Sequence, residues 1–144
     1  MRVQIENVLS PEEEGAVIRT VEVTENIRKC VELLENNAHR LIGYKDLSAY
    51  SLDMGTIYYF ESVDNRCFAY TKSDCFLVKY KLYELELLLD ERFFRCSKSM
   101  ICNSWKIREV KPDGSGRMRA VMRNDEIVII SRGYIGKLKE RLGL

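Results

Sequence analysis

Apolar and polar positions follow two different rhythms along the chain, and the change falls near residue 40. Residues 2–8 alternate and residues 16–23 are rich in β-branched side chains, so both segments are predicted to be strands. Residues 9–15, with Pro11 and three glutamates, read as the loop between them. Residues 25–36 place Ile27, Val31 and Leu34 on one helical stripe, and Thr24 can cap this helix.

Beyond residue 40 the pattern predicts short strands separated by turns rich in Asp, Asn, Ser and Gly. The expected strands are residues 41–44, 47–52, 57–62, 67–71, 76–80, 93–96, 107–111, 118–122 and 127–130. Residues 82–89 carry leucines at helical spacing, and a last helix capped by Ser131 is expected to run to about residue 142. The prediction is a mainly β (α+β) fold of small packed antiparallel sheets. A domain at residues 41–144 follows an N-terminal strand–strand–helix extension at residues 1–40.

Composition places the chain among globular proteins of a reducing compartment. Its 144 residues are 46% hydrophobic, which is enough for one core. No apolar run is long enough to cross a membrane, and residues 1–8 lack the layout of a signal peptide. The five cysteines are an odd, scattered set, which suits free thiols better than disulfides. We therefore expect a cytoplasmic protein.

Charge is distributed unevenly along the chain. Residues 1–90 carry ten Lys and Arg against 16 Asp and Glu, whereas residues 91–144 carry 13 against six. A basic C-terminal part on a chain of net charge +1 is a candidate surface for a polyanion such as nucleic acid.

The residues that catalysis or cofactor binding would need are missing from the sequence. The only histidine, His39, follows the first helix and reads as a capping or exposed residue. The cysteine spacings do not match those of zinc sites, and there is no glycine-rich phosphate loop. We therefore expect no enzymatic activity, no metal, no cofactor and no small-molecule substrate.

One stretch, "FFRCSKSMICNSWKI" from Phe93 to Ile107, interrupts a strand-like run with Ser97, Lys98 and Ser99. Hydroxyls beside an ammonium can bind phosphate oxygens, and the same residues can also form an ordinary surface turn. Asn103 can either bond a base edge or fix the turn through backbone groups.

This stretch resembles the F-x-R-x-H-R-S-[YF]-[LI]-V-N segment of LytTR-type DNA-binding domains. Three further segments are similar to motifs of that family and occur in the same order: "IYYFES", "KLYELELLL" and "IISRGYIGKLKERL". Together they cover roughly residues 41–144. The resemblance implies LytTR-type packed sheets whose edge loops enter successive major grooves of duplex DNA, in a transcriptional regulator that lacks a receiver domain.

The resemblance also implies where the DNA contacts lie: the turn after residue 61, the polar loop at residues 97–99, and the start of the last helix. The candidate DNA-binding residues are Asn65, Arg66, Arg95, Ser97, Lys98, Ser99, Asn103, Ser131, Arg132 and Lys137. Two positions depart from the family pattern. Ser97 stands where the family commonly has His, and Gly133 stands where a basic residue is frequent.

One such domain is small, so we expect a homodimer on a repeated site, with residues 1–40 either mediating dimerisation or extending the sheet. The family also suggests a small membrane protein as a partner. Two alternatives stay open: a protein-interaction module that uses Tyr58, Tyr80, Tyr83 and Trp105, and a single-strand or RNA-binding domain. A redox sensor would need a lowered thiol pKa at Cys96.

Overall fold

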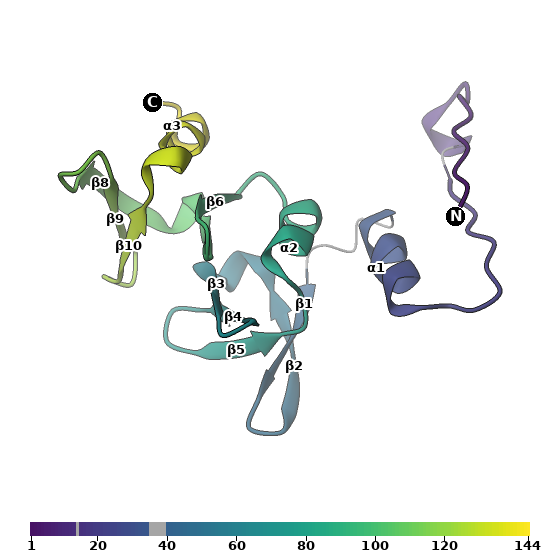
Figure 1. Cartoon of the computed structure of the whole chain (residues 1–144), viewed down its shortest axis with the longest axis horizontal. Coiled ribbons are helices and arrows are strands. Elements are labelled where there is room, and N and C mark those ends of the chain that lie inside the picture. Colours follow the sequence, from purple (N-terminus) through teal and green to yellow (C-terminus); the bar gives the residue numbers. More distant parts are fainter. Residues whose placement is uncertain (14, 35–39) are drawn as a thin grey trace.

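The computed structural model describes residues 1–13, 15–34 and 40–144 (Figure 1). Its helices are α1 (Glu25–Leu34), α2 (Leu82–Leu88) and α3 (Ile135–Leu142), and short 3-10 turns lie at Pro11–Glu13, Met54–Thr56, Ser104–Lys106 and Arg132–Tyr134. The strands are β1 (Arg40–Lys45), β2 (Ser48–Asp53), β3 (Tyr59–Val63), β4 (Arg66–Tyr70), β5 (Cys75–Val78), β6 (Phe93–Ser97), β7 (Met100–Asn103), β8 (Ile107–Pro112), β9 (Met118–Met122) and β10 (Ile127–Ile130).

The strands form two antiparallel sheets. The larger has seven strands in the order β2-β1-β5-β4-β3-β7-β6, and the smaller has three in the order β10-β9-β8. Tight turns join β1 to β2, β3 to β4 and β6 to β7, and each turn brings its two strands into direct pairing. The predicted mainly β fold of small antiparallel sheets is confirmed.

Strand β6 separates two hydrophobic cores. Side chains alternate along a strand, so Phe93 points into the core beneath α2 while Phe94 and Cys96 point into the core beneath α3. Phe60 and Leu85 are fully buried in the first core, which joins α2 to the seven-stranded sheet. The second core joins α3 to β6 and to the three-stranded sheet. Packing on both faces holds the β6–β7 hairpin, and hence its turn, in one position.

The structure corrects three details of the sequence prediction. Residues 2–8 and 16–23 form no strand, because no other described segment pairs with them. Strand β7 was not predicted, and it supplies the link between β3 and β6. Ser131 makes no side-chain cap, and α3 begins only at Ile135, after the 3-10 turn.

The predicted cap of the first helix is confirmed. Thr24 caps α1 by accepting a hydrogen bond from the Ile27 amide at 3.3 Å. The predicted end of this helix and His39 both lie outside the described residues.

No helix in the described part of the chain is long and apolar enough to cross a membrane. Within the same residues, no group of three or more His, Cys, Asp or Glu side chains could hold a metal ion.

Candidate nucleic-acid interface

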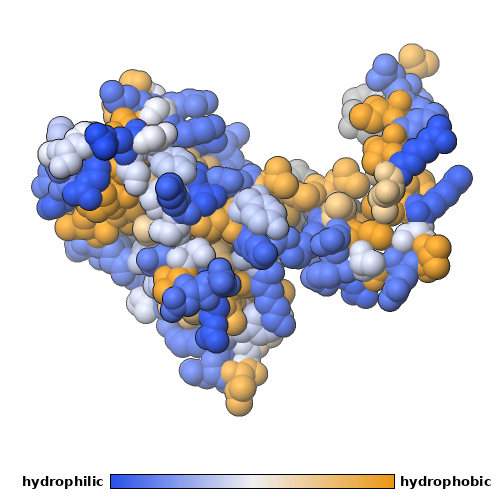
Figure 2. Space-filling view, in the orientation of Figure 1, coloured by the Kyte–Doolittle hydropathy of each residue, from blue (hydrophilic) through white to orange (hydrophobic). Residues whose placement is uncertain are grey.

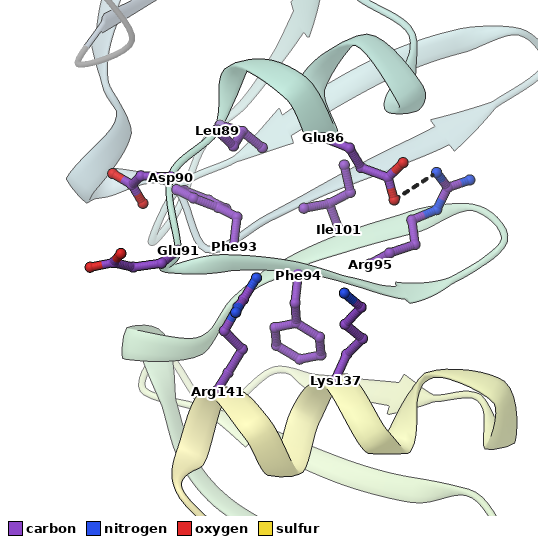
Figure 3. A pocket seen from close by; sticks show the side chains of 10 residues that line it. All are labelled: Glu86, Leu89, Asp90, Glu91, Phe93, Phe94, Arg95, Ile101, Lys137 and Arg141. Atoms are coloured by element: carbon purple, nitrogen blue, oxygen red, sulfur yellow. Dashed lines mark ion pairs between the residues drawn. The ribbon is translucent and has the colours of Figure 1, made fainter. Parts of the chain in front are cut away.

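The turn between β6 and β7 presents Lys98 to solvent. Arg95 fixes this turn from within, donating from Nε to the Ser97 carbonyl at 2.8 Å and from Nη2 to the Lys98 carbonyl at 2.5 Å. The third nitrogen of the guanidinium, Nη1, lies 3.3 Å from Glu86 Oε1 (Figure 3). Since three groups already occupy Arg95, its role in this structure is to shape the turn. Lys98 stays exposed.

The turn between β3 and β4 lies next to the Lys98 turn. The Ser62 amide near the end of β3 donates to the Ser99 carbonyl at 2.8 Å, which ties the two turns together. Asp64 and Asn65 both have positive φ, 51° and 60°, as a tight hairpin turn requires, and Asn tolerates this conformation well. Asn65 and Arg66 are exposed at this turn.

The segment that precedes α3 reaches the same place from the other sheet. The Ser131 amide donates to the Cys96 carbonyl at 2.9 Å, so Ser131 lies beside the last residues of β6. Arg132 is exposed, and its aliphatic part crosses the β8–β9 turn at Gly116. A Cβ at Gly116 would stand only 2.6 Å from Arg132 Cδ, so glycine is needed for this close approach.

Three predicted contact segments therefore meet at one end of the sheets. We call this set the basic rim; its members are Asn65, Arg66, Ser97, Lys98, Ser99, Ser131 and Arg132. Among the described residues, the side chains of Arg66, Lys98 and Arg132 have no recorded hydrogen-bond or ion-pair partner. Unpaired cations on adjoining exposed turns can bind an anion without first breaking an internal bond.

Asn103 does not belong to this surface, and its assignment as a DNA contact is wrong. It is 1% exposed at the far end of β7, away from the Lys98 turn. Its Nδ2 donates to the Ile57 carbonyl at 2.8 Å, and its Oδ1 accepts from the Trp105 amide at 3.0 Å. Both ends of the amide are thus occupied inside the protein, so the structural interpretation is the one that stands.

Lys137 lies on α3 beside a cleft of about 490 Å³ between α2 and α3. Figure 3 shows its side chain extending toward β6 beside Phe94, with Arg141 one helical turn further along. Lys137 is exposed but belongs to the wall of this cleft, whereas the rim residues lie on the turns.

Two arginines near the rim were missed from the sequence. Arg117 and Arg119 in the β8–β9 hairpin both pair with Asp113, at 3.1 and 2.9 Å. The close approach of Arg132 to Gly116 brings this hairpin beside the Ser131 segment. Sequence spacing does not reveal a contact between these two segments, so no signal in the sequence marked the two arginines.

The environment of Cys96 argues against a redox sensor. Burial raises the pKa of the Cys96 thiol to about 12, and the Arg95 charge offsets this only in part. Burial also raises the pKa of Cys102. A sensor thiol needs the opposite shift, since the thiolate is the reactive form.

The exposed aromatic residues do not gather at the rim. Tyr58 is buried and Tyr80 is half-buried, so neither offers a free ring. Tyr83 is 60% exposed, but it lies on α2 and not on a turn of the rim. Trp105 is 64% exposed, but it follows Asn103 at the opposite end of β7, where the Arg92 guanidinium lies 5.3 Å from its ring. The basic rim therefore lacks the stacking surface that single-strand binding uses.

Comparison with known proteins identifies the fold. The family model of the LytTr DNA-binding domain matches residues 48–143. The chain belongs to the LytTR family. A solved LytTr DNA-binding domain from Bacillus cereus is similar to this LytTR protein with a TM-score of 0.70 and 25% identity, over 74% of this chain and 98% of that domain.

Relatives of this LytTR protein occur among regulators of Staphylococcus aureus. An uncharacterized HTH-type transcriptional regulator of strain NCTC 8325 is 27% identical over 129 residues, 88% of each chain. Another from strain MSSA476 is 30% identical over 109 residues, 76% of this chain and 74% of that one. Their names mention a helix-turn-helix, but the helices described here are separated from each other by strands. The basic rim of this LytTR protein is built from turns instead.

Proposed function

We propose that this protein is a cytoplasmic transcriptional regulator that binds double-stranded DNA sequence-specifically through the basic rim. The observation that carries this proposal is the linkage of the rim. Backbone hydrogen bonds from Ser62 to Ser99 and from Ser131 to Cys96 hold the three turns together, and each turn bears a cation without a side-chain partner among the described residues. The LytTr family match and the regulator relatives support the same function.

The chemistry of the rim suits the major groove. Lys98 is a point charge for phosphate, and Ser97 and Ser99 add short hydroxyl groups at the same turn. Arg66 and Arg132 can each donate two hydrogen bonds to guanine, at O6 and N7, and Asn65 can bond the N6 and N7 atoms of adenine. Because these residues lie on separate turns, they would enter the groove at successive positions rather than along one helix.

Binding by one rim covers little DNA, so we propose that two copies act on a repeated site. The family resemblance also makes a small membrane protein a candidate regulator of this activity.

The test is the affinity for duplex DNA as a function of salt. Duplexes selected from a random pool supply the site, and fluorescence anisotropy then gives Kd between about 50 and 200 mM salt. We expect Kd to rise steeply with salt, and we expect Lys98→Ala to weaken binding and to lower the log–log slope by about one. A line without slope, or equal affinity for single strands, would contradict the proposal.

Lys139→Ala is the matched control for Lys98→Ala. Lys139 is an exposed lysine on α3 outside the rim, so its removal causes the same change in net charge. Equal losses for both variants would show that total charge, and not the rim, sets the affinity.

A further inference from the structure

The first residues of the chain form an arm without a core of its own. We define the N-terminal arm as residues 1–13 and 15–34, and no described side chain in it is buried. Figure 2 shows hydrophobic groups along the arm, which extends away from the sheets. The large hydrophobic residues exposed there are Met1, Val3, Ile5, Val8, Leu9, Val17, Val21, Val23, Leu33 and Leu34. A monomer rarely leaves so much apolar surface in contact with water.

The arm also leaves its backbone unpaired. Residues 2–8 have a strand-like sequence, yet no described segment forms a ladder with them. An unpaired strand presents a row of N–H and C=O groups that a second strand can satisfy. Residues 2–8 are therefore available to pair with a strand of another molecule.

The sequence at residues 2–6 is complementary to itself. If two copies pair in antiparallel fashion about a two-fold axis at Gln4, Arg2 lies opposite the partner's Glu6. Val3 then lies opposite the partner's Ile5, and each Gln4 faces its own copy. Val3 and Ile5, 78% and 88% exposed, would share one face, as alternating residues of a strand do. Opposite charges and paired apolar side chains both favour this register.

Helix α1, the last part of the arm, contacts the part of the chain that carries the sheets. Lys29 Nζ lies 2.6 Å from Glu84 Oε2 of α2, and Tyr80 donates a hydrogen bond to Glu32. These polar contacts fix the position of α1, while Leu34 at its end stays exposed. Whatever binds the arm is therefore held next to the sheets that carry the basic rim.

We propose that the N-terminal arm is a dimer interface whose occupant is the arm of a second copy, paired antiparallel about Gln4. A two-fold interface must be self-complementary, and the Arg2–Glu6 register meets that condition. The arm offers 33 described residues, and a stable interface uses about 20–30 on each side. This inference rests on the proposed function in one respect, because the dimer would bring a second basic rim to a repeated DNA site.

The first experiment measures the mass of the full chain by sedimentation equilibrium. We expect twice the 16.8 kDa of one chain for the wild type and a shift to monomer for Ile5→Asp, which places a carboxylate in the apolar pairing. Ile5 is 88% exposed, so this variant keeps the folded core. Leu47→Asp, at a position 110% exposed in the β1–β2 turn, is the matched control and should remain a dimer. A monomeric wild type at tens of micromolar, or an Ile5→Asp variant that dimerises as well as the wild type, would overturn the proposal.

A charge exchange tests the register. Arg2→Glu should weaken dimerisation roughly tenfold, because both symmetric copies of the pair become like-charged. Adding Glu6→Arg restores opposite charges in the proposed register and should restore the affinity. A double variant that stays as weak as Arg2→Glu would overturn the pairing about Gln4.

DNA binding separates this inference from the proposed function. We expect Ile5→Asp to bind a duplex with one repeat as well as the wild type does and to lose cooperative binding to two repeats. A wild type that dimerises but binds no duplex would refute the proposed function and leave the interface standing. One that binds duplex only as a monomer would refute the interface alone.

Discussion

At the residue scale, Asn103 and Lys98 have different roles in the same hairpin. Asn103 is buried and bonded at both ends of its amide, whereas Lys98 is exposed and unpaired within the described residues. The first holds the turn in place, and the second is available to a ligand. Stability and binding should therefore respond to different substitutions.

Replacement of Asn103 by alanine is expected to destabilise the protein by about 3 kcal/mol. The substitution removes the side-chain amide of Asn103, so the Ile57 carbonyl and the Trp105 amide each lose a hydrogen bond. An unsatisfied buried group costs about 1–3 kcal/mol. Urea unfolding followed by circular dichroism measures the change. Lys98→Ala is the comparison, and its unfolding free energy should stay within about 0.5 kcal/mol of wild type. Equal stabilities for the two variants would contradict the structural role of Asn103.

At the scale of the element, the β1–β2 hairpin carries a local conflict. Asp46 and Leu47 form its turn with φ of 50° and 68°, a region that favours Gly, Asn and Asp. Leu47 is fully exposed, so its side chain gains nothing from packing.

Leu47→Asn should therefore stabilise the protein by about 0.5–1 kcal/mol, because Asn tolerates the left-handed conformation better than Leu does. Thermal and urea unfolding test this, with the midpoint moving upward and the m-value unchanged. Asp46→Leu, which places a second leucine in the same turn, should shift the midpoint downward. A lower midpoint for Leu47→Asn would show that the turn is not strained.

The same scale shows what sequence can and cannot predict. Alternation located β3 to β5, and leucine spacing located α2, because each buries one face against a core. The four residues of β7 were too short to stand out after a polar turn. The strands predicted at residues 2–8 and 16–23 did not form, since β propensity takes effect only where another strand is available.

At the scale of the whole molecule, the basic rim depends on contacts between segments far apart in the chain. Ser62 bonds Ser99, and Ser131 bonds Cys96. Periodicity cannot reveal such pairs, so the family resemblance was needed to place the three turns together. The resemblance could not show that Asn103 is buried or that Arg95 is occupied by the turn, because both depend on local hydrogen bonds.

The N-terminal arm should contribute little to the free energy of unfolding of the sheets. The arm buries no described side chain, and the Lys29–Glu84 and Glu32–Tyr80 contacts are its recorded side-chain bonds to the sheet-bearing part of the chain. A chain that begins at Arg40 should therefore unfold with a free energy within about 1 kcal/mol of the full chain, because ion pairs near the surface contribute little. The comparison is made by urea unfolding at a protein concentration low enough to keep the full chain monomeric. A loss of several kcal/mol under these conditions would mean that the arm packs on its own sheets, and the apolar residues it exposes would then have an intramolecular purpose.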